Sequence, residues 1–198
     1  MVNEIILASK SEVRKKILEN NKIKCRVEPS NVDEDSVKES LLKEKATPTN
    51  VSKNLAELKA NKISQKFINE IVMGADSVID LGGEIISKPN NRSEALKILK
   101  KLNGKTHQLI SSVCISKAGS MIWNYTDKAS LTMKNMSLLE LETYLKKISD
   151  VSLYAYNVYQ IEGEGRGLFS KISFLTPLFE ASIISLTIIF IYFVYFNY

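Results

Sequence analysis

The residues best suited to chemistry in this sequence are hydroxyls, cations and carboxylates that follow short apolar runs. Ser9, Ser11 and Arg14 come directly after the apolar run 4–8 and open a helical stretch that reaches about residue 20. The N-terminus of a helix presents main-chain N–H groups and a partial positive charge, and it therefore favours phosphate. Hydroxyl and guanidinium groups at that end would add donors to phosphate oxygens. Ser11 as the cap of an ordinary helix is the alternative that this pattern leaves open.

A second pattern, Gly74-Ala75-Asp76-Ser77, follows the apolar residues 71–73. A carboxylate at the end of a hydrophobic strand is expected at the edge of a sheet, where open α/β folds place their ligands. Asp76 could accept a proton from an attacking water or hold a divalent cation against phosphate oxygens. An aspartate that caps the following turn is the alternative.

Further charged residues could belong to the same site. Lys88 precedes Pro89 after a glycine turn, Lys59 lies in a helical stretch, and Glu34 lies in an acidic segment that could supply metal ligands. Each of these types is also common on a solvated surface. His107 is the sole histidine, so the chain cannot form a histidine-rich metal site, and a structural hydrogen bond at a strand start is expected for it.

The overall composition narrows the class of protein. The chain has 198 residues, of which 44% are hydrophobic and 25% charged, which is typical of one globular domain or of two small lobes. The net charge of +5 suits an anionic ligand, but no long Lys/Arg block indicates nucleic acid. Cys25 and Cys114 lie far apart and outside any CxxC pattern, and the N-terminus resembles no signal peptide, so a cytoplasmic location is expected.

Strand-like and helix-like segments alternate along the chain. Strands are expected near 4–8, 22–28, 71–79, 84–87, 107–116 and 121–133, and helices near 11–20, 49–67, 93–102 and 137–148. Thr49 or Asn50 is the expected cap of the second helix, and Ser137 with Glu140 forms a capping box for the last. This alternation predicts an α/β domain with a mixed sheet.

In chain order these segments resemble the Maf family of nucleotide pyrophosphatases. The resemblance covers about residues 4 to 171 and rests on seven modest motifs in the right order. The motifs are LASKSEVR (7–14), VDE (32–34), KA (59–60), GADS (74–77), GE (83–84) with KP (88–89), GKTH (104–107) and YQIEGEG (159–165) with LF (168–169).

The resemblance implies a two-lobed, ITPase-like α/β fold with a twisted mixed sheet, flanking helices and a central cleft. It also implies cleavage of nucleoside triphosphates between the α and β phosphates with a divalent cation, Mg²⁺ or Mn²⁺. Asp76 matches the family's proposed proton acceptor and, with Glu34, a metal ligand. The polar cleft positions of the family that contact phosphate fall on Ser9, Arg14, Lys59 and Lys88.

The sequence departs from the family pattern at positions that concern the substrate. Glu12 and Val13 replace a Pro-Arg pair, so that Arg14 is the arginine that remains. The family's three specificity positions fall on Val13, Ser77 and Glu162. Members acting on dTTP and UTP carry Arg, Thr and Gln there, and members acting on 7-methyl-GTP carry Trp, Gln and Glu. Since this chain matches neither set, the preferred base stays open.

The segment 172–198 does not follow the family pattern, and the predicted catalytic domain therefore ends at residue 171. Residues 181–198 carry no charge. Three interpretations compete for this tail: a frameshifted or truncated ending, a membrane anchor close to the lower length limit of about 17 residues, and a core element that replaces the family's closing helix.

The leading hypothesis is a cytoplasmic, metal-dependent nucleoside triphosphate pyrophosphatase that acts on standard or modified nucleotides. A nucleotide-binding protein whose altered ending has cost it catalysis, and which acts as an interaction module in cell division, is the rival. A membrane-tethered form through 181–198 is a third interpretation, and the resemblance is compatible with a homodimer.

Overall fold

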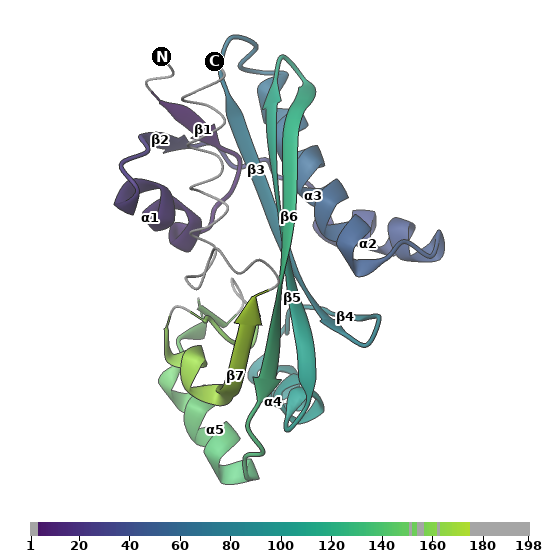
Figure 1. Cartoon of the computed structure of the whole chain (residues 1–198), viewed down its shortest axis with the longest axis vertical. Coiled ribbons are helices and arrows are strands. Elements are labelled where there is room, and N and C mark those ends of the chain that lie inside the picture. Colours follow the sequence, from purple (N-terminus) through teal and green to yellow (C-terminus); the bar gives the residue numbers. More distant parts are fainter. Residues whose placement is uncertain (1–3, 151, 154–156, 162, 175–198) are drawn as a thin grey trace. The chain divides into compact units, whose positions relative to one another are not determined.

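The computed structural model describes residues 4–150, 152–153, 157–161 and 163–174 (Figure 1). Within them, helices alternate with the strands of one seven-stranded mixed sheet, which confirms the predicted α/β class. The helices are α1 (Glu12–Asn20), α2 (Glu34–Lys43), α3 (Pro48–Ser64), α4 (Arg92–Leu102), α5 (Leu138–Lys147) and the short 3₁₀ helix η1 (Glu164–Leu168). The strands are β1 (Ile5–Leu7), β2 (Cys25–Val27), β3 (Val72–Leu81), β4 (Glu84–Ile86), β5 (Thr106–Lys117), β6 (Ser120–Met133) and β7 (Phe169–Phe174).

The sheet combines parallel and antiparallel pairs. Its strand order is β2-β1-β3-β5-β6-β7, with β4 paired to β3. Strand β1 runs parallel to both β2 and β3, whereas β4 is antiparallel to β3 and β7 is antiparallel to β6. The chain divides into two compact units, in agreement with the predicted two-lobed organisation. Of the described residues, the first unit holds 4–77 and 110–127, and the second holds 78–109 and those from 128 to 174.

Side-chain caps fix the ends of several helices where the sequence predicts them. Ser11 caps α1 by accepting a hydrogen bond from the Arg14 main-chain N–H, and Ser137 forms the predicted capping box at α5. The cap predicted for α3 is wrong, because the helix begins earlier and Thr47 is its cap. Pro48 takes the first helical position, where its fixed φ and missing N–H carry no penalty, so the helix begins before Thr49.

Strand β3 runs to Leu81, two residues beyond the expected strand 71–79, and Asp76 lies inside it. The prediction that Asp76 stands at the end of a hydrophobic strand is therefore wrong. Strand β1 pairs with β3 only at Val72 and Met73 and ends at Leu7. Beyond Met73, β3 therefore continues past the carboxyl end of its parallel neighbour.

The core of the second unit surrounds a buried histidine. Large apolar side chains from β6, α4 and α5, among them Leu131, Leu99 and Leu141, form one cluster there. His107, at the start of β5, is buried beside this cluster, and its Nε2 atom lies 2.7 Å from the Tyr159 hydroxyl. The structural hydrogen bond predicted for His107 is confirmed.

The tail predicted to begin at residue 172 lies mostly outside the described residues. Its first three residues belong to β7, in which Ile172 pairs with Leu131 and Phe174 pairs with Ala129 of β6. Residues 175–198, and with them the interpretations of the apolar run 181–198, fall outside the described part of the chain. Among the described residues, no helix combines the length and the apolar character that crossing a membrane requires.

We predict that His107 titrates far below an ordinary histidine. Burial disfavours the imidazolium and lowers the pKa of His107 to about 4. Since an unfolded chain binds this proton at a pKa near 6.5, acidification through the window between about 6.5 and 4 favours unfolding. The chain has one histidine, so a single set of imidazole NMR signals reports the titration. A midpoint near 6.5 in the folded protein would contradict the buried setting.

Candidate functional site

The first unit brings three charged side chains to one point. The Lys59 ammonium of α3 lies 2.7 Å from Asp76 Oδ1 on β3 and 2.8 Å from Glu34 Oε1 at the start of α2. Lys59 and Asp76 are each 5% exposed, whereas Glu34 is about one third exposed. Three residues predicted from separate motifs are thus one ion-paired cluster, which we call the carboxylate–lysine cluster.

The carboxylate–lysine cluster leaves one carboxylate atom in an unusual state. Asp76 Oδ1 accepts from Lys59, but the buried Oδ2 atom accepts no hydrogen bond from the described residues. An unpaired buried carboxylate oxygen is costly, since nothing replaces the water that it loses on folding. The same atom is well suited to accept a proton from water or to bind a cation, and this is the chemistry predicted for Asp76.

The beginning of α1 forms a second polar group in the same unit. Ser9 Oγ accepts hydrogen bonds from the Ser11 main-chain N–H, at 3.2 Å, and from Arg14 Nη1, at 3.1 Å. A hydroxyl oxygen has two lone pairs and one proton, so these bonds use the lone pairs and leave the proton to be donated. Ser9 therefore offers a donor beside a guanidinium at a helix N-terminus, as phosphate binding requires.

Strand pairing places these two groups at the same end of the sheet. The Ala8 main-chain N–H donates to the Met73 carbonyl, at 2.8 Å, and this is the last bond between β1 and β3. Ser9 follows that bond by one residue and Asp76 by three. Because β1 and β3 are parallel, both residues lie beyond the carboxyl end of β1, which is where α/β folds place ligands.

Two buried hydroxyls near Asp76 are not among the residues that the sequence predicts. Ser52 on α3 donates to the main-chain carbonyl of Asp76, at 3.2 Å, and is fully buried. Ser111 on β5 shares a hydrogen bond of 2.9 Å with Ser77, which is one of the predicted specificity positions. The spacing of Ser52, seven residues before Lys59, would have placed both on one helix face, but a lone serine has no sequence signal of its own.

The remaining predicted residues lie in different settings. Val13 is half-buried on α1, in the same unit as the carboxylate–lysine cluster. Lys88 is exposed just after β4 and belongs to the second unit. Glu162 lies outside the described residues. The roles predicted for these three residues stay predictions.

The donor set is compatible with a hard divalent cation. Within the described residues, no three or more histidine, cysteine, aspartate or glutamate side chains gather into a complete metal site. Mg²⁺, however, is commonly held by one or two carboxylates together with substrate phosphates and water. Glu34 and Asp76, with the unpaired Oδ2 atom, supply two such carboxylates, and Lys59 reduces their mutual repulsion.

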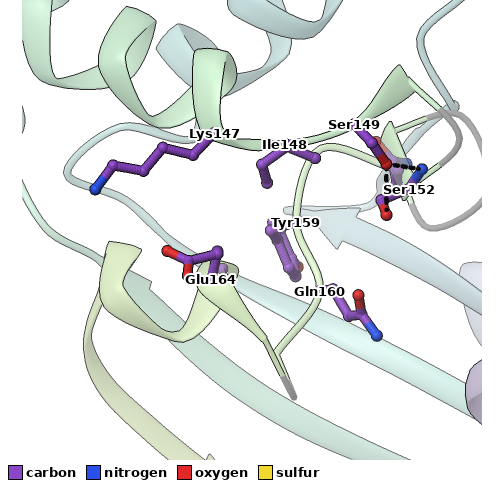
Figure 2. Close-up of a pocket in the computed structure, with 9 residues that line it drawn as sticks. Lys147, Ile148, Ser149, Ser152, Tyr159, Gln160 and Glu164 are labelled. Atoms are coloured by element: carbon purple, nitrogen blue, oxygen red, sulfur yellow. Dashed lines mark hydrogen bonds between the residues drawn. The ribbon is translucent and has the colours of Figure 1, made fainter.

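A separate cavity of about 230 Å³ lies within the second unit, next to the end of α5 and to η1 (Figure 2). Lys147 and Glu164 line it from different elements, and the Ser149 and Ser152 hydroxyls bond to each other at 3.1 Å. The Tyr159 side chain also lines it. None of the predicted catalytic or phosphate-binding residues lines this cavity.

Comparison with known proteins gives matches along most of the chain. A family model described as Maf-like protein matches residues 4–174. A nucleoside triphosphate pyrophosphatase of Pelagibacter ubique (strain HTCC1062) is 84% identical over 87% of this chain and 88% of the relative. A 7-methyl-GTP pyrophosphatase of Brucella abortus biovar 1 (strain 9-941) is 36% identical over 87% of this chain and 86% of the relative. Among solved structures, a HAM1 protein from Coxiella burnetii matches with a TM-score of 0.43 at 12% identity, over 69% of this chain and 75% of that chain.

We predict that Lys59→Met destabilises the fold by about 3–5 kcal/mol, because it leaves the buried Asp76 carboxylate without its counter-charge. The matched control is Lys62→Met on the same helix. Lys62 is exposed and donates to the Asn31 carbonyl, so its loss should cost less than about 1 kcal/mol. Urea unfolding measures both variants. Equal unfolding free energies would show that the buried pair contributes no more than a surface lysine.

Proposed function

Because the chain belongs to the Maf-like protein family, we propose that it is a nucleoside triphosphate pyrophosphatase. Such an enzyme cleaves its substrate into a nucleoside monophosphate and inorganic diphosphate. The observation that carries this proposal is the carboxylate–lysine cluster, in which Asp76 keeps one buried oxygen unpaired. The names of the relatives from Pelagibacter ubique and Brucella abortus support the same reaction class.

In the proposed reaction, Asp76 is the general base. Its Oδ2 atom takes a proton from the water that attacks the α-phosphorus, and the bond between that phosphorus and the bridging oxygen to the β-phosphate breaks. The electron pair of that bond leaves with the diphosphate. Lys59 holds Oδ1, at 2.7 Å, so that Oδ2 is the carboxylate atom left for the water.

The charges of the triphosphate require positive partners. Ser9 and Arg14 would donate to phosphate oxygens from the start of α1. Lys88 is a further proposed phosphate-binding residue. The resemblance also implies a phosphate contact for Lys59. Its contacts with two carboxylates favour instead a role in holding Asp76 and Glu34. Glu34 and Asp76 would hold a Mg²⁺ or Mn²⁺ ion, which when bound would offset phosphate charge.

The sequence motifs do not determine which nucleotide base the protein prefers. Val13, Ser77 and Glu162 are the proposed specificity positions, and the Ser77 hydroxyl is already engaged with Ser111. Relatives named for a general activity and relatives named for 7-methyl-GTP both match this chain. We therefore include modified nucleotides among the proposed substrates. A cytoplasmic location and a homodimer remain part of the proposal.

We predict that Asp76→Asn lowers kcat by about 10³-fold, in the range that a general base contributes. The fold should persist, because Asn has nearly the same shape and Lys59 keeps its contact with Glu34. Diphosphate release from a panel of standard and 7-methylated triphosphates measures the effect and the base preference together. Asp80→Asn on the same strand is the control, since Asp80 accepts from the Gly83 N–H in a turn. Full activity in Asp76→Asn would remove Asp76 from this role, and nucleotide binding without product in the unaltered protein would favour the inactive rival.

We also predict that chelation of divalent cations stops diphosphate release and that Mg²⁺ or Mn²⁺ restores it. Glu34→Gln should raise the Mn²⁺ concentration needed for half-maximal activity by about tenfold or more, because it removes one of two carboxylate ligands. Mn²⁺ binding followed by electron paramagnetic resonance checks the affinity without turnover. Glu39→Gln is the control, as Glu39 pairs with Lys43 on the exposed face of the same helix. Equal Mn²⁺ affinity in both variants would exclude Glu34 as a ligand.

A further inference from the structure

Helix α3 packs against strand β3 through contacts at regular intervals, and Asp76 is the last strand residue in this series. We call this series of contacts the α3–β3 register. Residues at every second position of β3, from Val72 through Gly74 to Asp76, meet α3 at successively earlier turns. Val72 clusters with Ile63, near the end of α3. A two-residue step on a strand covers about 6.6 Å and a four-residue step on a helix about 6 Å, so the two elements stay matched over this length.

Gly74 allows the close approach in the middle of this register. A Cβ atom at Gly74 would lie 2.6 Å from the Ala60 main-chain nitrogen and nearer still to the Ala56 carbonyl oxygen. Any larger residue would push α3 away from β3, because the atoms in the way belong to the backbone. The register thus brings the main chain of the helix against the strand two residues before Asp76.

At the next step of the register, α3 holds Asp76 at two points. Lys59 Nζ donates to the carboxylate, at 2.7 Å, and Ser52 Oγ donates to the main-chain carbonyl, at 3.2 Å. The two helix residues are seven positions apart, which is about two turns, so they lie on the same face. Ser52 is fully buried, and its hydroxyl has no access to water that could replace this bond.

We propose that Ser52 is a positioning residue for Asp76, which fixes the main chain of the base so that its carboxylate stays aligned with Lys59. Without the Ser52 bond, the Asp76 carbonyl loses its partner on α3, and the Lys59 contact is what still ties Asp76 to that helix. Small displacements of a general base reduce the rate of the chemical step while leaving substrate binding unchanged. This inference deepens the proposed function and rests on it.

The test compares Ser52→Ala with Ser64→Ala on the same helix. Ser64 is equally buried, donates to the Asn61 carbonyl and accepts from the Gly119 N–H, so its removal costs hydrogen bonds away from Asp76. We expect Ser52→Ala to lower kcat about tenfold with KM changed less than about twofold, and Ser64→Ala to change neither. Ser52→Cys keeps the side-chain volume but donates weakly, and it should behave like Ser52→Ala.

A second measurement reads the position of Asp76 without turnover. In protein labelled with ¹³C at aspartate carboxyls, the Asp76 signal is identified by its absence in Asp76→Asn. We expect this signal to shift in Ser52→Ala and Ser52→Cys and to stay in place in Ser64→Ala. Wild-type kcat and an unmoved signal in both Ser52 variants would overturn the positioning role, even if Asp76→Asn is inactive. If the unaltered protein releases no diphosphate, the proposed function fails and the carboxyl signal still decides whether Ser52 positions Asp76.

Discussion

The buried ion pair between Lys59 and Asp76 is the interaction on which the candidate site depends. Two charges that are each 5% exposed persist inside a protein only when they neutralise each other and their geometry is held by neighbours. Here the neighbours are Glu34, which shares the lysine, and Ser52, which holds the Asp76 main chain. The close packing of α3 on β3 at Gly74 makes this arrangement possible. Stability and chemistry therefore draw on the same contacts in the first unit.

The sequence predicts local features well where a short-range rule decides them. Ser11 at α1 and the Ser137–Glu140 box at α5 are confirmed because a cap needs only a hydroxyl or carboxylate and a helix beginning one to three residues later. The structural hydrogen bond predicted for His107 is confirmed as well, at the start of an apolar strand. The α/β class and the mixed sheet follow from the alternation of these segments.

The sequence is a weaker guide where partners come from distant segments. Asp76 and Ser77 read as the end of a strand because they are polar, but β3 continues since Lys59, Ser52 and Ser111 supply partners for them from other elements. The same distance applies to Lys59, for which the resemblance implies a phosphate contact. Its contacts with two carboxylates appear only once α2, α3 and β3 are folded together. The sequence does not indicate the contact of Ser52 with Asp76, because nothing in the neighbouring residues distinguishes Ser52 from an ordinary buried serine.

We propose that Glu34 and Asp76 together hold a divalent cation against the triphosphate. A crystal structure with Mn²⁺ and a triphosphate whose α–β bridging oxygen is replaced by a methylene group tests this arrangement, because the anomalous signal of manganese locates the ion independently of the chain tracing. We expect an anomalous peak within about 2.5 Å of carboxylate oxygens of Glu34 and Asp76. The α-phosphate should lie near Asp76 Oδ2, and Ser9 and Arg14 should bind other phosphate oxygens. A triphosphate bound elsewhere, with no manganese beside either carboxylate, would exclude this arrangement.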